Sequence, residues 1–107
     1  RLIKEYGVGY IKMDYNIEPG IGTDLHADSA GDGMLSHERA YLKWLEAVFK
    51  RYPDLVIENC SSGGLRMDYA MLSRYSIQST SDQDDYRYYC TIAANSPSAL
   101  TPEQSAI

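Results

Sequence analysis

Short apolar segments alternate with helical patterns along this chain, and this alternation constrains the fold more than any other feature of the sequence. The strand-like segments are residues 7–14, 54–60 and 75–80. Each is preceded by a segment with helical character, and a last helix is predicted over residues 84–94. Such alternation produces parallel strands joined by right-handed crossovers. The sequence therefore predicts an α/β fold with about three parallel βα units.

The helix between the first two strands has the clearest pattern. Apolar side chains recur at helical spacing from Tyr41 to Tyr52, and Pro53 ends the helix. Ser36 is the predicted N-cap. Asp68 is predicted to cap a short helix that runs through Leu72. Residues 15–35 have the Gly and Pro content of a long loop, and the tail after residue 94 is predicted to be irregular.

Two architectures contain units of this kind, the open doubly wound sheet and the (β/α)8 barrel. No G-x-G-x-x-G follows the first strand, which argues against a dinucleotide-binding fold. A barrel needs roughly 250 residues, and this chain has 107. In the barrel interpretation, residues 1–107 are the central part of one (β/α)8 domain, with no second domain.

Charge and composition exclude several classes of partner. Lys and Arg number 10 against 15 Asp and Glu, so the net charge is −5. A chain without a basic patch is not expected to bind nucleic acid or an anionic membrane. Cys60 and Cys90 form no metal-binding spacing. A disulfide between them is the alternative, but two free thiols, as in a cytosolic protein, are the prediction. The chain begins without Met, so any targeting segment is expected to lie outside it and the compartment stays open.

Reactive polar residues stand where the three predicted strands end. Lys12 and Asp14 close the first strand, Cys60 the second, and Asp82 follows the third. In a parallel sheet these ends share one edge, which carries the site in barrels and open sheets. Lys12 and Asp14 point to the same side of their strand, and a lysine beside a carboxylate favours its ionised form. Two carboxylates facing across a pocket are what glycoside hydrolysis needs.

Non-catalytic roles for these aspartates compete with catalysis. A single Asp at a strand end is more often a loop or cap residue, so a non-catalytic α/β sugar-binding module is an alternative.

No metal site is predicted, because residues 82–85 lack the Gly and Glu of a calcium loop. No cofactor is implied.

Three motifs resemble those of the α-galactosidases in glycoside hydrolase family 36. Residues 10–16 resemble the family's Lys-aromatic-Asp-x-Asn motif. Residues 58–68 resemble its Cys-Ser-x-Gly-Gly-x-Arg-x-Asp motif, and residues 79–85 its Trp-Thr-Ser-Asp-x-x-Asp motif. They occur in the family's order and at compatible spacings, over residues 7–85.

The resemblance implies strands four to six of a (β/α)8 barrel and a retaining mechanism. Asp14 matches the family's nucleophile and Asp82 its acid/base. Arg66 and Asp68 match a pair expected to form a buried ion pair that shapes the turn. The resemblance also implies a galactose subsite with four residues of this chain: Lys12, Asn16, Cys60 and Ser62.

The implied reaction is hydrolysis of terminal α-galactosides of the melibiose and raffinose type, with an α-galactoside as substrate partner. A galactosyl transferase of the raffinose or stachyose synthase type is the alternative within the family. The 107 residues alone are expected to be inactive. The sequence is compatible with a parent protein that forms a homo-oligomer. Met13 and Ser79 stand where the family usually has Trp, and Ser62 and Leu65 replace glycines. These departures bear on which sugar is accepted.

Overall fold

The computed structural model describes residues 1–18, 20 and 22–106, which form two compact units. The first unit combines residues 1–16 with residues 54–106 and contains the sheet. The second unit lies between them in the sequence, over Ile17–Pro53, and contains one long helix. Each unit is described by itself below.

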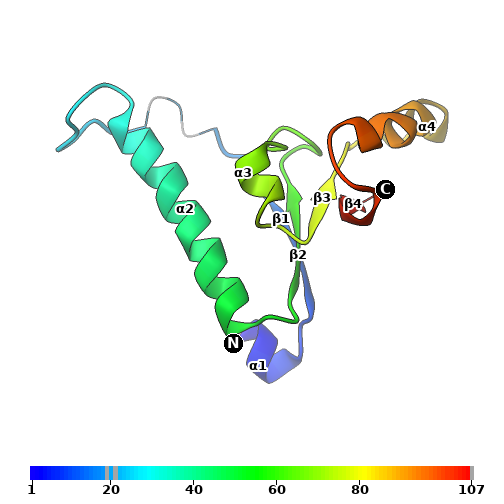
Figure 1. The fold of residues 1–107 in the computed structure, drawn as a ribbon, viewed down its shortest axis with the longest axis horizontal. Helices are drawn as coiled ribbons and strands as arrows, with labels where there is room; N and C mark the ends of the chain where they lie inside the picture. The colour runs from blue at the N-terminus through cyan, green and yellow to red at the C-terminus, as the bar shows by residue number, and fades with distance from the viewer. Residues whose placement is uncertain (19, 21, 107) are drawn as a thin grey trace. The chain divides into compact units, whose positions relative to one another are not determined.

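A parallel sheet organises the first unit (Figure 1). Within the described residues its strand order is β1-β2-β3-β4, and every neighbouring pair is parallel. The strands are β1 Tyr10–Asp14, β2 Val56–Cys60, β3 Ile77–Ser79 and β4 Ser105–Ala106. Lys12 lies opposite Glu58 in the register, and Asp14 lies opposite Cys60. These strands and the helices between them confirm the α/β class, and the arrangement is that of part of a (β/α)8 barrel.

Short helices precede or connect the strands of this unit. They are α1 Leu2–Tyr6, α3 Tyr69–Leu72, α4 Tyr86–Asn95 and the 3₁₀ turns η1 Ser96–Ser98 and η2 Pro102–Gln104. The Asp68 carboxylate accepts a hydrogen bond from the Met71 N–H (3.0 Å), so the predicted cap of α3 is confirmed. Asp85 caps α4 in the same way by accepting from the Arg87 N–H. Both helices begin at an Asp because its side chain satisfies a free N–H of the first turn.

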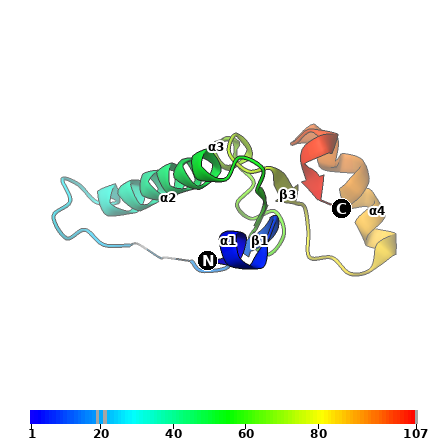
Figure 2. The same cartoon turned by 90° about the horizontal axis from the view of Figure 1, so that it is seen from below.

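The C-terminal segment is more ordered than predicted. The sequence predicts an irregular tail, but η1, η2 and β4 follow α4, and this segment lies beside the helix (Figure 2). The Gln104 side-chain amide donates to the Leu72 carbonyl (2.9 Å), and the Thr80 hydroxyl donates to the Ala106 carbonyl (3.3 Å). These bonds tie the tail to α3 and β3, and a two-residue strand is too short to produce a sequence pattern.

The sheet's two faces differ in chemistry. One face of β2 carries Ile57 and Asn59, both buried, and the Asn59 amide donates to the buried Gln78 amide oxygen (2.7 Å). The other face carries Glu58 and Cys60, next to the exposed residues of β1. The apolar core of this unit comprises Leu55, Ile57, Met71, Tyr75 and Leu100.

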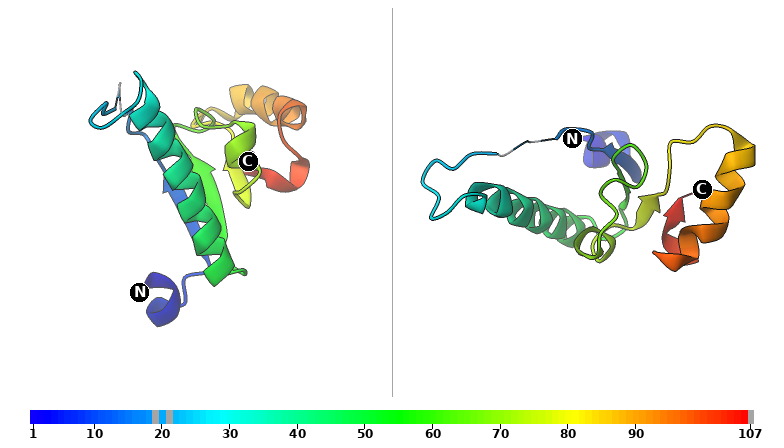
Figure 3. Two further views of the ribbon diagram at one scale, coloured as in Figure 1. Left: turned by 60° about the vertical axis from the view of Figure 1, so that its left-hand side comes forward. Right: turned by 90° about the horizontal axis from the view of Figure 1, so that it is seen from above.

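The second unit contains α2, a continuous helix over Asp32–Arg51 (Figure 3). The prediction that Ser36 caps this helix is wrong, because the helix begins at Asp32 with Gly31 (φ 85°) as its N-cap. Gly33 fits the first turn for lack of a side chain: a Cβ there would lie 1.7 Å from the Thr23 carbonyl oxygen. Among the described residues, no helix has the length and apolarity needed to cross a membrane.

Candidate active site

One face of the sheet is concave and polar. Tyr10, Lys12 and Asp14 occupy alternate positions of β1 and therefore share this face. A concavity of about 430 Å³ opens over it. The residues that line the concavity come from β1, β2, β3, the loop after β3, α4 and β4: Tyr10, Lys12, Glu58, Ser79, Ser81, Tyr89 and Ala106.

The two predicted catalytic carboxylates stand at the carboxyl edge of this sheet. Asp14 is the last residue of β1, and Asp82 lies in the loop that follows β3. Both are exposed. Neither makes a hydrogen bond or an ion pair with any residue in the described part of the chain. Because the strands are parallel, both side chains are carried by the same edge of the sheet.

Lys12 has a different partner from the one the sequence suggests. Its ammonium nitrogen lies 3.4 Å from Oε1 of Glu58, in an ion pair between β1 and β2. The Tyr10 hydroxyl donates to the other carboxylate oxygen of Glu58. The sequence pattern assigns no role to Glu58 or Tyr10. The only sequence signal for Glu58 is an acidic residue inside an apolar strand, facing a lysine once the register is known.

Asn16 and Ser62 join the loops that follow β1 and β2. The Asn16 amide oxygen accepts from the Ser62 N–H (2.7 Å) and from its hydroxyl (3.3 Å). Ser61 donates from its hydroxyl to the Tyr15 carbonyl (2.6 Å). Ser62 has a φ of 41°, a left-handed conformation that favours glycine. The loops after β1 and β2 are therefore bonded together, with the side chains of Asn16 and Ser62 exposed.

Arg66 and Asp68 do not form the expected buried ion pair. Asp68 is exposed, and its carboxylate caps α3. Arg66 donates from Nε to the Tyr15 carbonyl (3.2 Å), and its guanidinium lies 4.0 Å from the centre of the Tyr15 ring. The expectation of a buried pair is wrong because Asp68 starts a helix at the surface. Arg66 instead ties the loop after β2 to the end of β1.

Gly63 brings the loop after β2 against the loop that carries Asp82. A Cβ at Gly63 would lie 2.4 Å from the Ser81 Cα, and its φ is 75°. Only glycine fits this contact. The Thr80 hydroxyl also shares a hydrogen bond with the Tyr89 hydroxyl (2.9 Å), which fixes the start of the same loop to α4. The loops after β1, β2 and β3 therefore form one connected cluster.

Comparison with known proteins shows which family the chain belongs to. The sequence model of the Melibiase family matches residues 1–105. The chain belongs to the Melibiase family. It is similar to an α-galactosidase of Escherichia coli, with 30% identity over 102 residues, which cover 95% of this chain and 14% of that protein. It is also similar to an α-galactosidase of Lactobacillus acidophilus, with 33% identity over 70 residues, which cover 64% of this chain and 10% of that protein.

This Melibiase chain thus spans a small part of the length of its curated relatives. No solved structure matches it.

The two cysteines of this Melibiase chain are free thiols, as predicted. Cys60 is fully buried at the end of β2, opposite Asp14 in the register, whereas Cys90 is exposed on α4. In the described residues, His, Cys, Asp and Glu form no cluster of three or more that could hold a metal ion.

The side-chain hydrogen bond from Arg87 lowers the pKa of Asp85, at the start of α4, below its ordinary value.

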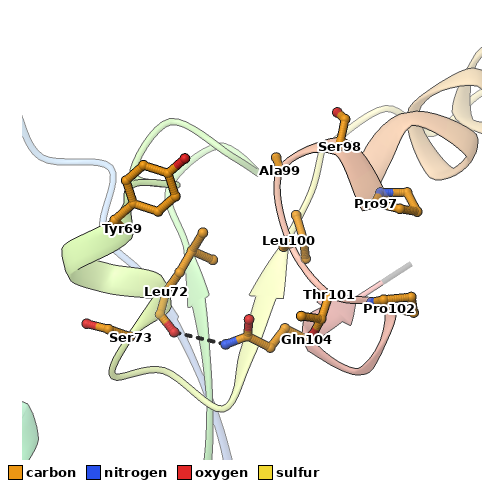
Figure 4. A pocket seen from close by; sticks show the side chains of 10 residues that line it. All are labelled: Tyr69, Leu72, Ser73, Pro97, Ser98, Ala99, Leu100, Thr101, Pro102 and Gln104. Carbon is orange, nitrogen blue, oxygen red and sulfur yellow. Dashed lines mark hydrogen bonds between the residues drawn. The ribbon is translucent and has the colours of Figure 1, made fainter.

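A larger concavity, of about 700 Å³, lies between α3 and the segment from η1 to η2 (Figure 4). Its wall includes Tyr69, Leu72 and Gln104, and it contains no carboxylate, lysine or histidine. It therefore offers no pair of groups for acid–base chemistry, and the polar face of the sheet is the better candidate in this Melibiase chain.

Proposed function

We propose that the whole protein hydrolyses terminal α-galactosides with retention of configuration, using Asp14 as nucleophile and Asp82 as acid/base. The observation that carries this proposal is the pair of exposed, unpartnered carboxylates at one edge of a parallel sheet. Membership of the Melibiase family and the names of the two relatives support it. We further propose that the sheet belongs to a complete (β/α)8 barrel in the whole protein.

The reaction takes two steps. Asp14 attacks the anomeric carbon while Asp82 gives a proton to the glycosidic oxygen, so that the C–O bond breaks and a glycosyl-enzyme forms. Asp82, now a carboxylate, takes a proton from a water molecule, which attacks the same carbon and releases Asp14. Two inversions give overall retention. A retaining pair holds its carboxyl groups about 5–5.5 Å apart, and this separation stays a prediction for Asp14 and Asp82.

The sugar subsite is proposed on the same face. Lys12 lines the concavity with a half-exposed side chain, and Asn16 and Ser62 are exposed in the loops that follow β1 and β2. Cys60 stands opposite Asp14 in the β1–β2 register and is fully buried, so in the described chain it lies beneath this face. Ammonium, amide and hydroxyl groups suit the hydroxyls of a sugar, which both donate and accept hydrogen bonds.

Azide rescue of single variants of the full-length protein tests the two catalytic roles. With an aryl α-galactoside whose phenol is a good leaving group, Asp82→Ala should still form the glycosyl-enzyme but stall before hydrolysis. Azide needs no base, so it should restore turnover and yield the α-galactosyl azide. In Asp14→Ala, azide should give the β-azide or no product.

Asp84→Ala is the matched control, because Asp84 is an exposed aspartate in the same loop. It should keep wild-type turnover and respond little to azide. The same azide product from both catalytic variants, or exchanged products, would show that the roles are wrongly assigned. Full activity of either variant without azide would overturn the proposed function.

A further inference from the structure

Glu58 is a buried acid in the middle of β2 that the proposed reaction does not use. Its side chain is 7% exposed, whereas the side chain of its partner Lys12 is 47% exposed. Each carboxylate oxygen has a partner from β1: Oε1 faces the Lys12 ammonium at 3.4 Å, and Oε2 accepts from the Tyr10 hydroxyl. Both side chains line the concavity, and the acid is the buried member of the pair whereas the lysine is the exposed one.

The sheet register imposes this arrangement. Lys12 is the direct neighbour of Glu58 across the β1–β2 ladder, and Tyr10 precedes Lys12 by one full pleat on the same face. A carboxylate buried without a partner is strongly unfavourable, so Glu58 needs both groups from β1. The pair therefore fixes where the lysine side chain can go.

An ammonium has three donors and no acceptor. The Glu58 carboxylate occupies one side of the Lys12 ammonium. The remaining N–H donors are left for a ligand in the concavity. Lys12 forms no ion pair with Asp14 or any other described acid apart from Glu58. The Glu58 carboxylate thus neutralises the charge of Lys12. A neutralised ammonium suits the donation of hydrogen bonds to a neutral sugar.

We propose that Glu58 is a positioning residue for substrate binding: it holds the Lys12 ammonium against a ring hydroxyl of the galactosyl group, and Tyr10 holds Glu58. This inference rests on the proposed function, since it takes the sugar to lie over the polar face of the sheet. It assigns Glu58 no part in bond making. Its effect reaches the sugar through Lys12, in the ground state and the transition state alike.

Glu58→Gln in the full-length protein tests this role, because it removes the charge and keeps the shape. An interaction of equal strength in both states changes KM and leaves kcat unaltered. A hydrogen bond that involves a charged group is worth roughly a factor of ten or more. We expect KM for an aryl α-galactoside to rise about tenfold and kcat to stay within about twofold. Tyr10→Phe should raise KM less, and Glu103→Gln, an exposed acid in η2, should change neither constant.

A comparison with the double variant Lys12→Met/Glu58→Gln separates positioning from a general structural role. Lys12→Met alone leaves Glu58 buried without its cation and can unfold the protein, whereas the double variant also removes that buried charge. If Glu58 acts through Lys12, the lysine has already lost its position in Glu58→Gln. The two effects are then not additive, and the double variant should have nearly the KM of Glu58→Gln.

The outcomes are distinct. If the wild type is active and Glu58→Gln has the same KM as the wild type, the positioning role is overturned. The same holds if Glu58→Gln loses kcat at constant KM. Both results leave the proposed function intact. A further rise in KM of about tenfold from Glu58→Gln to the double variant also overturns it, because Lys12 would then bind the sugar without Glu58. A correctly folded wild type without α-galactosidase activity overturns the proposed function, and the inference with it.

Discussion

The first unit holds two sets of polar side chains with opposite properties. Glu58, Asn59 and Gln78 lie inside strands, are buried, and have a hydrogen-bonding or ionic partner each. Asp14 and Asp82 stand at the end of a strand or beyond it, are exposed, and have no partner among the described residues. A buried polar group must be paired, so it serves the fold and is unavailable to a ligand. The unpaired carboxylates at the strand ends are the groups left for chemistry.

Asp14→Asn should have the largest effect on activity of the proposed variants. It should therefore separate the exposed carboxylates most clearly from the buried polar residues. If Asp14 is the nucleophile, its loss should lower kcat/KM for an aryl α-galactoside by about 10⁴-fold. The melting temperature of the full-length protein should stay that of the wild type, because the exposed carboxylate has no contact to lose. Kinetics and calorimetry on one preparation measure both. A variant that unfolds would place Asp14 with the structural set.

Gly63→Ala tests the contact that joins the loops after β2 and β3. The added methyl would meet the Ser81 backbone, and the positive φ disfavours an L-residue. We expect a loss of about 3 kcal/mol in the free energy of unfolding, with a lower kcat because the Asp82 loop shifts. Urea unfolding measures it. Gly9→Ala is the control: a Cβ there meets nothing within 4 Å, so the protein should keep its stability.

Asn59→Leu tests the buried set by itself. It leaves the Gln78 amide oxygen without its donor inside the sheet, and the Arg66 carbonyl also loses a hydrogen bond. An unsatisfied buried group costs about 2 kcal/mol, so urea unfolding should show a loss of that size. Asn95→Ala removes an exposed amide at the end of α4 and should cost far less. Equal losses in the two variants would contradict the distinction between buried and exposed polar groups.

Asp85→Asn should have the smallest effect. Asp85 has a lowered pKa because Arg87 donates to its carboxylate. A lowered pKa in the folded state means that the ionised acid stabilises the protein above its ordinary pKa of 3.8, and that this contribution fades as the pH falls through the lowered value. The difference in stability between wild type and Asp85→Asn should therefore be constant near neutral pH and shrink in acid. A difference that grows in acid would contradict the assignment.

The sequence predicts the strands well, because their apolar runs are local patterns. Residues 54–60 are predicted as a strand from their apolar run, and Val56–Cys60 forms it. The helix at Asp32 begins earlier than predicted, because a left-handed glycine replaces the usual Ser or Thr cap. The Lys12–Glu58 pair could not be predicted, since it depends on the register of two strands that are far apart in the sequence. The roles of Asp14 and Asp82 stay predictions.

The order in which this sheet assembles follows from its discontinuous first unit. The β1–β2 contacts join residues as far apart as Tyr15 and Ser61, 46 positions, while Asn59 and Gln78, across β2 and β3, are 19 positions apart. Closing the longer loop costs about 0.8 kcal/mol more in chain entropy. We therefore expect the β2–β3 contacts of this unit to form before the β1–β2 contacts. Because β1 carries Asp14, Lys12 and Tyr10, the proposed nucleophile and the proposed sugar-binding lysine are then expected to take their places after the β2–β3 contacts have formed.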